Sequence, residues 1–430
     1  MRKTFVADLP ARIGERVTLG GWVHRLRTLS STTFVILRDA SGTAQCVAAT
    51  DALAGTHLKL DDAVEVDGRV RADERSRFGG FEVDIDAVRV VGPAAQDLPF
   101  HPSADLAAVG QDVLLAHRPL SLRNDRVGAA FRVQATILEL FRDFLRRQRF
   151  TEIVSSKIVS GGTEGGANLF KIDYFDRAAY LAQSPQFFKE HGVCGLERVF
   201  ETAHVYRAEP HATVRHLTEY YSLDLEMGFI DGPEDVIALE RTLLTHVFAE
   251  LASKHADLLK PFQGKPLPSL DQAPTWEFSE CLARLAKAHR RTDLVDDLDP
   301  DAERQLCALA EKEHGVPAVF VLGFPLKSRP FYTHPRGTEG AAQSFDLLFR
   351  GLEITTGGQR LHTRSALETS LRGRGVDPAT FSDHLRMFDL GMPPHGGLAI
   401  GLERLTAQVL GLTNIREVTL YPRDRQHVSP

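Results

Sequence analysis

The sequence predicts an α+β protein with two parts: a small N-terminal five-stranded β-barrel of the OB type and a larger domain built on an antiparallel sheet. Residues 1 to about 90 carry short strand patterns separated by turn signals, which is typical of a small barrel. Beyond residue 124, strand and helix patterns alternate without the regular helical crossovers of a parallel sheet. The intervening segment is rich in Pro and Asp, which indicates a hinge. We therefore expect a barrel domain at 1–95, a hinge at 96–123 and a second domain at 124–430.

The composition is that of an ordinary globular protein. Of 430 residues, 43% are hydrophobic and 25% are charged, and the mean hydropathy is -0.17, which excludes disordered, fibrous and membrane chains. No apolar run reaches the roughly 18 residues of a spanning helix, and Met1 is followed by charged residues where an export signal would be apolar. The net charge of -6 excludes a polycation and leaves room for local nucleic-acid-binding patches.

The number and spacing of the cysteines indicate the redox compartment and bear on metal binding. The four cysteines show no CxxC or metal-ligand spacing, so no zinc site is predicted. Free thiols that serve as small apolar residues are typical of a reducing compartment, and we expect the cytoplasm. These residues are Cys46, Cys194, Cys281 and Cys307.

Five segments of the first domain alternate apolar and polar residues or are rich in β-branched ones, as strands are. They are 17–24, 33–38, 44–48, 63–70 and 81–85, with turn signals at 39–42 and 79–80 and one helical stretch near 49–60. Barrels of this type commonly bind single-stranded nucleic acid on an exposed face.

The second domain is predicted to begin with a helix over 127–149. Its apolar residues recur at helical spacing, and it ends in the basic run 146–149, which suits the negative end of a helix dipole. Further strands are predicted at 198–206, 220–229, 319–324, 344–349 and 398–400, and helices at 233–253, 278–288 and 301–313.

Three segments of this domain place charged residues inside otherwise apolar strands, where charge is costly unless a partner or a ligand meets it. Taken singly, each has an ordinary structural explanation: a cross-strand ion pair, two solvated acids or a turn. Their joint order favours a functional site. The segments are 205–226 with Arg207, Glu209, Asp224 and Glu226; 344–360 with Asp346 and Glu353; and the glycine-rich 396–405 with Arg404.

These segments resemble the motifs of class II aminoacyl-tRNA synthetases. Residues 200–229 look like motif 2 and residues 397–405 like motif 3, while the helix at 127–149 with the strand at 150–154 is similar to motif 1. The barrel and this core together span essentially the whole chain and resemble the aspartyl, asparaginyl and lysyl subgroup. Residues 183–189 are close to the QSPQxxK segment of aspartyl-tRNA synthetases, and the chain lacks the large insertion of common bacterial enzymes, as compact archaeal-type members do.

The resemblance implies an ATP site with two catalytic arginines. Arg207 would bridge the ATP α-phosphate and the substrate carboxylate, and Arg404 would lie against the nucleotide from the opposite side. Asp346 and Glu353 would hold Mg²⁺, which neutralises the phosphates of the substrate ATP. The other implied ATP contacts are Glu209 at the adenine amino group, Tyr220 stacked on the adenine, Arg215 and His216 at the outer phosphates, and Glu353 and Gly401.

The choice of amino acid is argued from charge. Lys189 and Arg360 offer two cations for the second carboxylate of aspartate, and Arg360 can bind it bidentately. Asparagine would leave Lys189 as an unpaired buried cation, so aspartate is favoured. The aspartate-binding residues implied by the resemblance are Glu164 on a mobile lid at 160–168, Gln186 and Asp224 at the α-amino group, Lys189, Arg207 and Arg360.

In the barrel, Phe34 is similar to the phenylalanine on which an anticodon base stacks in the family, although Phe34 could equally be barrel core. Arg27, Gln45 and Glu82 stand at the matching base-contact positions. His24 replaces the tryptophan of discriminating relatives and resembles relaxed members that charge both tRNA(Asp) and tRNA(Asn); it could also be a solvent-facing histidine. Relaxed charging implies an amidotransferase partner acting on Asp-tRNA(Asn).

A homodimer is expected from the family. Motif 1 normally ends in a proline, and Ser155-Ser156-Lys157 stands in its place here. The rival interpretations are a discriminating aspartyl enzyme, an asparaginyl-tRNA synthetase, a tRNA-independent aspartate amidating ligase, and a non-catalytic RNA-binding module. The barrel argues against the amidating ligase, and the joint retention of the charged motif residues argues against a non-catalytic chain.

Overall fold

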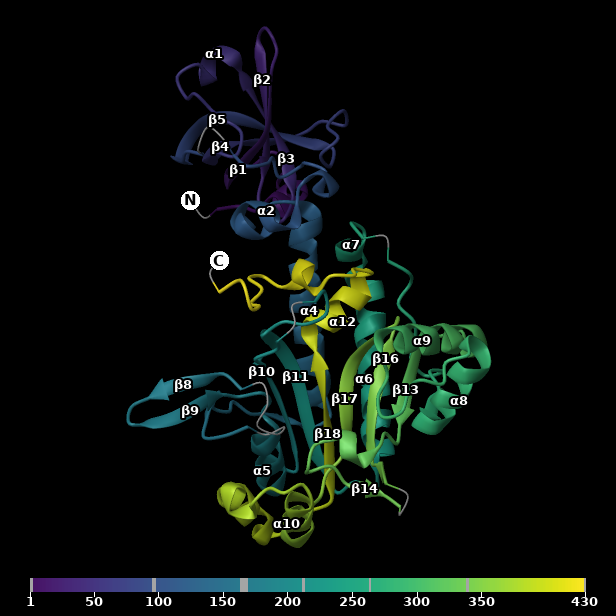
Figure 1. Ribbon diagram of the computed structural model, residues 1–430. Helices are drawn as coiled ribbons and strands as arrows, with labels where there is room; N and C mark the ends of the chain where they lie inside the picture. Colours follow the sequence, from purple (N-terminus) through teal and green to yellow (C-terminus); the bar gives the residue numbers. More distant parts are fainter. Residues whose placement is uncertain are drawn as a thin grey trace. The chain divides into compact units, whose positions relative to one another are not determined.

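The computed structural model describes residues 3–94, 98–162, 169–210, 213–262, 264–337 and 340–428 (Figure 1). The chain divides into two compact units, Met1–His101 and Pro102–Pro430. Within the described ranges, no helix is both long and apolar enough to cross a membrane.

The first unit is a closed five-stranded barrel in the strand order β1-β2-β3-β5-β4. Its core consists of inward-facing aliphatic residues such as Leu19, Val35 and Val66, all fully buried. The five predicted strands are confirmed, but the helical stretch near 49–60 is much shorter than predicted. The strands are β1 (Arg16–Thr28), β2 (Thr32–Arg38), β3 (Thr43–Ala49), β4 (Ala63–Ala72) and β5 (Phe81–Gly92), with the helix α1 at Thr50–Leu53.

The second unit is built on an eight-stranded sheet in the order β12-β13-β16-β17-β18-β11-β10-β6. All pairs are antiparallel except β12 with β13 and β6 with β10, at the two edges. The antiparallel prediction is therefore confirmed for the interior of the sheet. The strands are β6 (Thr151–Glu152), β10 (Arg198–Tyr206), β11 (Glu219–Gly228), β12 (Thr275–Glu277), β13 (Ala318–Leu322), β16 (Ser344–Phe349), β17 (Leu352–Gln359) and β18 (His395–Gly401).

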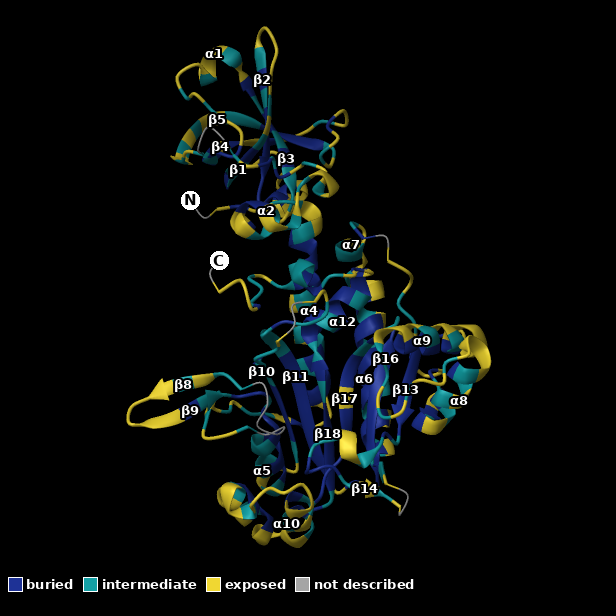
Figure 2. Ribbon diagram, in the orientation of Figure 1, coloured by how far each residue is buried: buried dark blue, intermediate teal, exposed yellow. Residues whose placement is uncertain are grey.

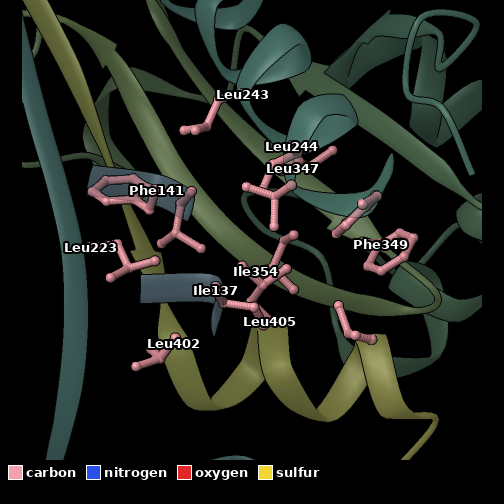
Figure 3. Packing of buried hydrophobic residues seen from close by; sticks show 14 of the residues in the cluster. Ile137, Phe141, Leu223, Leu243, Leu244, Leu347, Phe349, Ile354, Leu402 and Leu405 are labelled. Carbon is pink, nitrogen blue, oxygen red and sulfur yellow. The ribbon is translucent and has the colours of Figure 1, made fainter. Parts of the chain in front are cut away.

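Helices cover the sheet and bury its apolar face (Figure 2). Side chains of α4, α6 and α12 interdigitate with those of the central strands, as Ile137, Leu244 and Leu405 show in Figure 3. The helices are α2 (Gln111–Ala116), α3 (Arg118–Ser121), α4 (Asp125–Arg147), α5 (Gln186–Leu196), α6 (Pro233–Lys254), α7 (Ala256–Leu259), α8 (Phe278–His289), α9 (Pro300–His314), α10 (Arg364–Gly373), α11 (Ser382–Met387) and α12 (Leu402–Leu410). Two small sheets, β7-β9-β8 and β14-β15, lie outside the main sheet; their strands are β7 (Ile158–Val159), β8 (Lys171–Tyr174), β9 (Arg177–Leu181), β14 (Pro335–Arg336) and β15 (Ala341–Ala342).

The helix α4 begins two residues before the predicted start because Asn124 caps it. The Asn124 side chain accepts hydrogen bonds from the backbone N–H groups of Arg126 and Val127 at 3.0 and 3.4 Å. Most of the segment predicted as a hinge belongs to the second unit and contains α2 and α3. Its role as a hinge remains a prediction.

The segment in place of the motif 1 proline is tied down by side chains. Ser155 donates its Oγ to Glu201 at 2.6 Å, and the Lys157 ammonium lies 2.9 Å from the same carboxylate on β10. These polar contacts fix the chain direction that a proline ring would otherwise restrict.

Strand β18 lies between β17 and β11 and carries Gly396 and Gly397 where its neighbours leave no room for a side chain. A Cβ atom on Gly397 would collide with the carbonyl oxygen of Leu225 and with the carboxylate of Glu226. A backbone carbonyl inside a sheet cannot move aside without breaking the ladder.

We predict that Gly397→Ala destabilises the second unit by roughly 1–3 kcal/mol, which is the usual cost of overpacking. Chemical denaturation followed by circular dichroism measures this change. Gly195→Ala is the matched control, because Gly195 lies in α5 with open space around the added methyl group. The control should leave stability unchanged or raise it by about 0.5–1 kcal/mol. Equal denaturation midpoints for Gly397→Ala and for the protein without the substitution would contradict the packing argument.

Candidate active site

One face of the main sheet carries a row of acidic and small residues, because the strand register places them directly opposite one another. Asp224 on β11 lies opposite Ala399 on β18, Ala399 lies opposite Thr356 on β17, and Thr356 lies opposite Asp346 on β16. Directly opposed residues share a face, so these four form one row across the sheet. Gly397 and Gly401 flank Ala399 on the same face of β18. Small side chains in the middle of the row leave space for a ligand between the acids.

A bulge brings Glu353 to this face. The register of β16 with β17 shifts between Leu347 and Leu348, so that Leu348 pairs with Glu353 and Ile354 is the extra residue. Glu353 is three residues before Thr356, so in a regular strand the two side chains would point to opposite faces. The extra residue of the bulge turns Glu353 to the same face as Thr356. The bulge therefore places Glu353 on the face that carries Asp346, and of these two acids Glu353 lines the cavity over this face.

A cavity of about 420 Å³ lies over this face, and all eight residues predicted to contact ATP line it. They are Arg207, Glu209, Arg215, His216, Tyr220, Glu353, Gly401 and Arg404. The fold thus brings this predicted set together from β11, β17, β18 and α12 and from the loop that joins β10 to β11.

The arginines of this cavity are held by neighbouring acids and rings. The Arg207 guanidinium lies over the Tyr220 ring, 5.6 Å from its centroid. Arg404 donates to the backbone oxygen and to the carboxylate of Glu353, at 3.0 and 3.3 Å. Arg215 donates to both carboxylate oxygens of Glu303 on α9, at 2.7 and 2.8 Å. The positive groups are therefore oriented before a ligand arrives.

The two predicted metal ligands fit a hard divalent cation. Burial raises the pKa of Glu353, and the nearby negative charge of Asp346 raises it further. A divalent cation between them would relieve this repulsion. Among the described residues, no group of three or more His, Cys, Asp or Glu side chains forms a candidate metal site. A cation held by this pair alone would take its other ligands from phosphates and water, which is the usual arrangement for Mg²⁺.

Asp346 is also held by a residue that the sequence analysis did not single out. Arg329 donates to both Asp346 oxygens at 3.1 and 2.7 Å and lies over the Phe324 ring at 3.8 Å. Thr356 donates its hydroxyl to the same carboxylate. Arg329 and Thr356 both line the cavity. Arg329 lies outside every motif quoted above, and the signal that would have identified it is its position in a basic, proline-flanked run, Lys327-Ser328-Arg329-Pro330.

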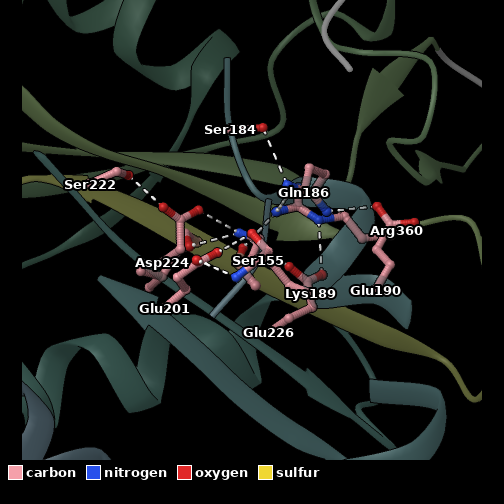
Figure 4. Close-up of polar contacts among 12 residues, drawn as sticks. Ser155, Ser184, Gln186, Lys189, Glu190, Glu201, Ser222, Asp224, Glu226 and Arg360 are labelled. Carbon is pink, nitrogen blue, oxygen red and sulfur yellow. Dashed lines mark hydrogen bonds and ion pairs between the residues drawn. The ribbon is translucent and has the colours of Figure 1, made fainter. Parts of the chain in front are cut away.

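Beside the cavity, four buried side chains form a cluster of two cations and two carboxylates (Figure 4). The Lys189 ammonium lies 3.0 Å from Asp224 and 3.4 Å from Glu226. The Arg360 guanidinium donates to Glu226 at 3.1 Å and to the backbone oxygen of Gly397 at 3.1 Å. All four residues are at most 6% exposed, so each charge needs its partner. We call Lys189, Asp224, Glu226 and Arg360 the ionic cluster.

The ionic cluster corrects one step of the charge argument for aspartate. Lys189 is not a surface lysine, since it is 1% exposed. It is also not unpaired in the absence of a ligand, because Asp224 and Glu226 both contact it. Asparagine would therefore not leave Lys189 without a counter-ion, and discrimination must arise from the extra carboxylate that the two cations attract. Glu226 completes the cluster, and the sequence analysis gave it no role in the site.

The predicted lid lies mostly outside the described residues. Glu164 lies outside the residues that the structure describes. Residues Ser160, Gly161 and Gly162 line a second cavity of about 1010 Å³, which shares Arg329 with the first.

In the barrel, the predicted anticodon contacts share one outer face. Phe34 pairs with Arg27 across β1 and β2, and Gln45 pairs with Ile36, two residues along the same face. The Gln45 side-chain amide donates to Glu82 at 2.9 Å. Phe34 is half-buried and is not part of the inward-facing core. Phe34 is therefore not a residue of the barrel core.

His24 occupies a β-bulge. The register of β1 with β2 shifts between Val23 and Arg25, which leaves His24 as the extra residue. Its ring lies 5.7 Å from the ring of His101, and it is half-buried. It is therefore not a simple solvent-facing histidine, and the bulge directs its side chain differently from its neighbours.

Comparison with known proteins agrees with this geometry. Residues 110–425 match the family described as tRNA synthetases class II (D, K and N), and residues 17–91 match the OB-fold nucleic acid binding domain. Aspartate--tRNA(Asp/Asn) ligase of Deinococcus radiodurans is 42% identical over 100% of this chain and 99% of its own length. Aspartate--tRNA(Asp) ligase of Pyrococcus horikoshii is 34% identical over 97% of each chain.

Solved structures share the whole fold. Asparaginyl-tRNA synthetase from Pyrococcus horikoshii superposes with a TM-score of 0.91 at 28% identity, covering 100% of both chains. Aspartyl tRNA synthetase from Entamoeba histolytica gives 0.87 at 30% identity, covering 100% of this chain and 93% of its own. The chain belongs to the class II tRNA synthetases of the D, K and N group. It is accordingly an aminoacyl-tRNA ligase, whose substrates are a tRNA, ATP and an amino acid.

Beneath the site, Glu240 of α6 lies in the core with Thr355 as its hydrogen-bond donor, at 2.6 Å. Burial raises the pKa of Glu240 to about 8. The folded protein therefore holds a proton that the unfolded chain releases above its ordinary pKa of 4.5.

We predict that this proton makes the protein less stable as pH rises from 5 to 8. The contribution of Glu240 is complete below the unfolded pKa and is lost as pH rises through the folded pKa, with a slope of at most about 1.4 kcal/mol per pH unit. Glu240→Gln keeps the neutral form, so its unfolding free energy should depend less on pH over this range. If the unfolding free energies of Glu240→Gln and of the unsubstituted protein, measured by chemical denaturation, change equally with pH, Glu240 is not the group that holds this proton.

Proposed function

We propose that this chain is an aspartyl-tRNA synthetase that charges both tRNA(Asp) and tRNA(Asn). Aspartate and ATP would give aspartyl-adenylate and pyrophosphate, and the aspartyl group would then pass to the terminal ribose of the tRNA. The observation that carries the amino-acid choice is the ionic cluster, which places Lys189 and Arg360 side by side on Glu226. The relatives named Aspartate--tRNA(Asp/Asn) ligase, 36–42% identical over the whole chain, support the same choice.

The residues of the first cavity would position and neutralise the reactants. Arg207 would hold the aspartate α-carboxylate against the α-phosphate and stabilise charge as the new bond forms. Tyr220 and Glu209 would bind the adenine, and Arg215 and His216 would hold the outer phosphates. Arg404 would lie against the nucleotide from the opposite side. Gly401 leaves room for the nucleotide.

Mg²⁺ is the metal we propose for the pair Asp346 and Glu353. When bound, it would neutralise the phosphates and the pyrophosphate leaving group. Arg329 holds Asp346 in the ligand-free site, so we infer that Arg329 keeps this carboxylate oriented towards the cavity.

The amino-acid pocket would extend over the ionic cluster. Lys189 and Arg360 would attract the aspartate side-chain carboxylate, and Gln186 with Asp224 would bind its ammonium group. We also propose that Glu164 closes over this ammonium when the lid at 160–168 folds down.

Phe34, Arg27, Gln45 and Glu82 would read the anticodon on the outer face of the barrel, by stacking and hydrogen bonding. His24 at its bulge would accept the third anticodon base of either tRNA. An amidotransferase acting on Asp-tRNA(Asn) is the partner that such relaxed charging requires.

Two further features belong to this proposal. A homodimer is supported by Val154, which follows the motif 1 strand β6 and is 95% exposed, as an apolar interface residue is in an isolated chain. A cytoplasmic location follows from the substrates, because tRNA is charged where proteins are made.

Asparaginyl and discriminating aspartyl enzymes are the two rivals. Fold likeness does not separate them, because an asparaginyl enzyme superposes as well as an aspartyl one. Aminoacylation with labelled aspartate and labelled asparagine, each against tRNA(Asp) and tRNA(Asn) transcripts, tests all three. Aspartate on both tRNAs supports the proposal. Aspartate on tRNA(Asp) alone, with tRNA(Asn) charged below about one per cent of that rate, would make the enzyme discriminating, and asparagine on tRNA(Asn) would make it asparaginyl.

We predict that Arg360→Lys lowers kcat/KM for aspartate by at least about 100-fold, because an ammonium cannot bind a carboxylate bidentately and leaves the Gly397 carbonyl without its donor. Aspartate-dependent pyrophosphate exchange measures it. Arg364→Lys, on an exposed ion pair of α10, is the matched control and should be nearly neutral. If Arg360→Lys lowers kcat/KM for aspartate as little as Arg364→Lys does, aspartate does not bind at Arg360.

We predict that His24→Trp lowers charging of tRNA(Asn) about tenfold or more while tRNA(Asp) charging stays within about twofold, because an indole fills the space beside the third anticodon base. The ratio of kcat/KM for the two transcripts is the measurement. His57→Trp, in the loop after α1, serves as the control and should leave the ratio unchanged. An unchanged ratio in His24→Trp would remove His24 from tRNA choice.

A further inference from the structure

A second buried polar group lies directly behind the amino-acid pocket. Glu190 is fully buried on α5, one residue after Lys189. Its Oε2 atom lies 3.4 Å from Nε2 of His384 and 3.9 Å from Nε2 of His395. Nδ1 of His384 in turn lies 2.9 Å from Nε2 of His191. The proposed chemistry uses none of these four residues.

The charge state of this group follows from its surroundings. Burial opposes ionisation of Glu190, but the nearby rings of His395 and His384 lower the pKa of its carboxyl to about 2. Burial lowers the pKa of His384 to about 4, so this ring is neutral at pH 7. Glu190 raises the pKa of His395 against the effect of burial. Glu190 is therefore an anion at neutral pH.

Glu190 fixes which way the Gln186 amide faces. The Gln186 Nε2 group donates to Oε1 of Glu190 at 2.7 Å, and Oε1 of Gln186 accepts from Arg360 at 3.4 Å. A carboxylate only accepts hydrogen bonds and a guanidinium only donates them, so both neighbours enforce the same orientation. Figure 4 shows the three side chains side by side. The amide oxygen is thereby kept on the side of the ionic cluster.

His384 packs against Glu190. Nε2 of the neutral His384 ring comes within 3.4 Å of Oε2 of Glu190, and the Nδ1 atom of the same ring shares a hydrogen bond of 2.9 Å with Nε2 of His191. Phe187 stacks on the His384 ring with centroids 3.9 Å apart and limits its rotation. The His384 ring therefore keeps one nitrogen against the Glu190 carboxylate.

We propose that Glu190, oriented by His384, is a positioning residue that turns the Gln186 oxygen towards the α-ammonium group of the amino-acid substrate. This inference rests on the proposed aspartate pocket. A carboxylate so far from water is costly, and a neutral amide at position 190 would bury more cheaply. What an amide cannot do is exclude the wrong orientation of Gln186, because it both donates and accepts.

The test is aspartate-dependent pyrophosphate exchange with the full chain carrying Glu190→Gln, Gln186→Ala or both. Glu190→Gln should raise KM for aspartate about tenfold and change kcat less than about threefold, since one hydrogen bond to the substrate ammonium is affected. In the Gln186→Ala background the same substitution should have no further effect, because the amide that it orients is gone. Glu240→Gln is the matched control, a fully buried glutamate that accepts from Thr355 and makes no hydrogen bond to Gln186, and should leave KM unchanged.

A second pair of variants covers the case in which Glu190→Gln folds poorly. His384→Leu removes the ring nitrogen that faces Glu190 and should raise KM for aspartate, whereas His384→Gln places a side-chain N–H near the position of Nε2 and should restore it. If Glu190→Gln raises KM for aspartate by the same factor in the Gln186→Ala background as in the unsubstituted protein, the inference is overturned. Equal KM values for His384→Leu and His384→Gln would also overturn it. Absence of aspartate-dependent exchange in the unsubstituted protein would instead overturn the proposed function itself.

Discussion

The need to neutralise charge inside a dry sheet is the constraint on which the rest of the second unit depends. Lys189, Asp224, Glu226 and Arg360 come from α5, β11 and the end of β17, and none is more than 6% exposed. Removing any one would leave one buried charge in excess, which costs several kcal/mol. The packing of α5 against β11 and the register of β11, β18 and β17 must therefore be right before these charges can be buried. On the proposed function, the same arrangement gives the amino-acid pocket cations that are already aligned.

The neighbouring cavity follows a different electrostatic rule. Of the four arginines that line it, Arg215, Arg329 and Arg404 hold carboxylates of Glu303, Asp346 and Glu353. ATP phosphates must compete with these carboxylates for the arginines, and a divalent cation competes with the arginines for the carboxylates. On the proposed function, nucleotide and metal therefore help each other to bind, because each releases the groups that the other needs.

What the sequence could predict depended on distance along the chain. The hairpin of β10 and β11 and the segment at 183–189 are local patterns, so the ATP-contact set and Lys189 were found from spacing and resemblance. The bulge that turns Glu353 to the cavity shifts the alternation by one residue, and no local pattern announced it. The contact of Arg329 with Asp346 spans 17 residues, and that of His191 with His384 spans 193. Such pairs are visible only once the sheet is assembled, which is why the charge argument for Lys189 needed correction.

Strand β18 has a consequence for how the chain is made. Residues His395–Gly401 join β17 to β11 in the middle of the sheet, yet they are synthesised after every other described strand of that sheet. Until they emerge, β10 and β11 cannot meet β16 and β17, and Asp224 has no row of neighbours leading to Asp346. A nascent chain thus holds two half-sheets with unpaired inner edges, which are sticky surfaces during folding. Ribosomes translating one message in succession would expose these edges close together, so this protein should depend on chaperones during synthesis far more than its finished structure would indicate.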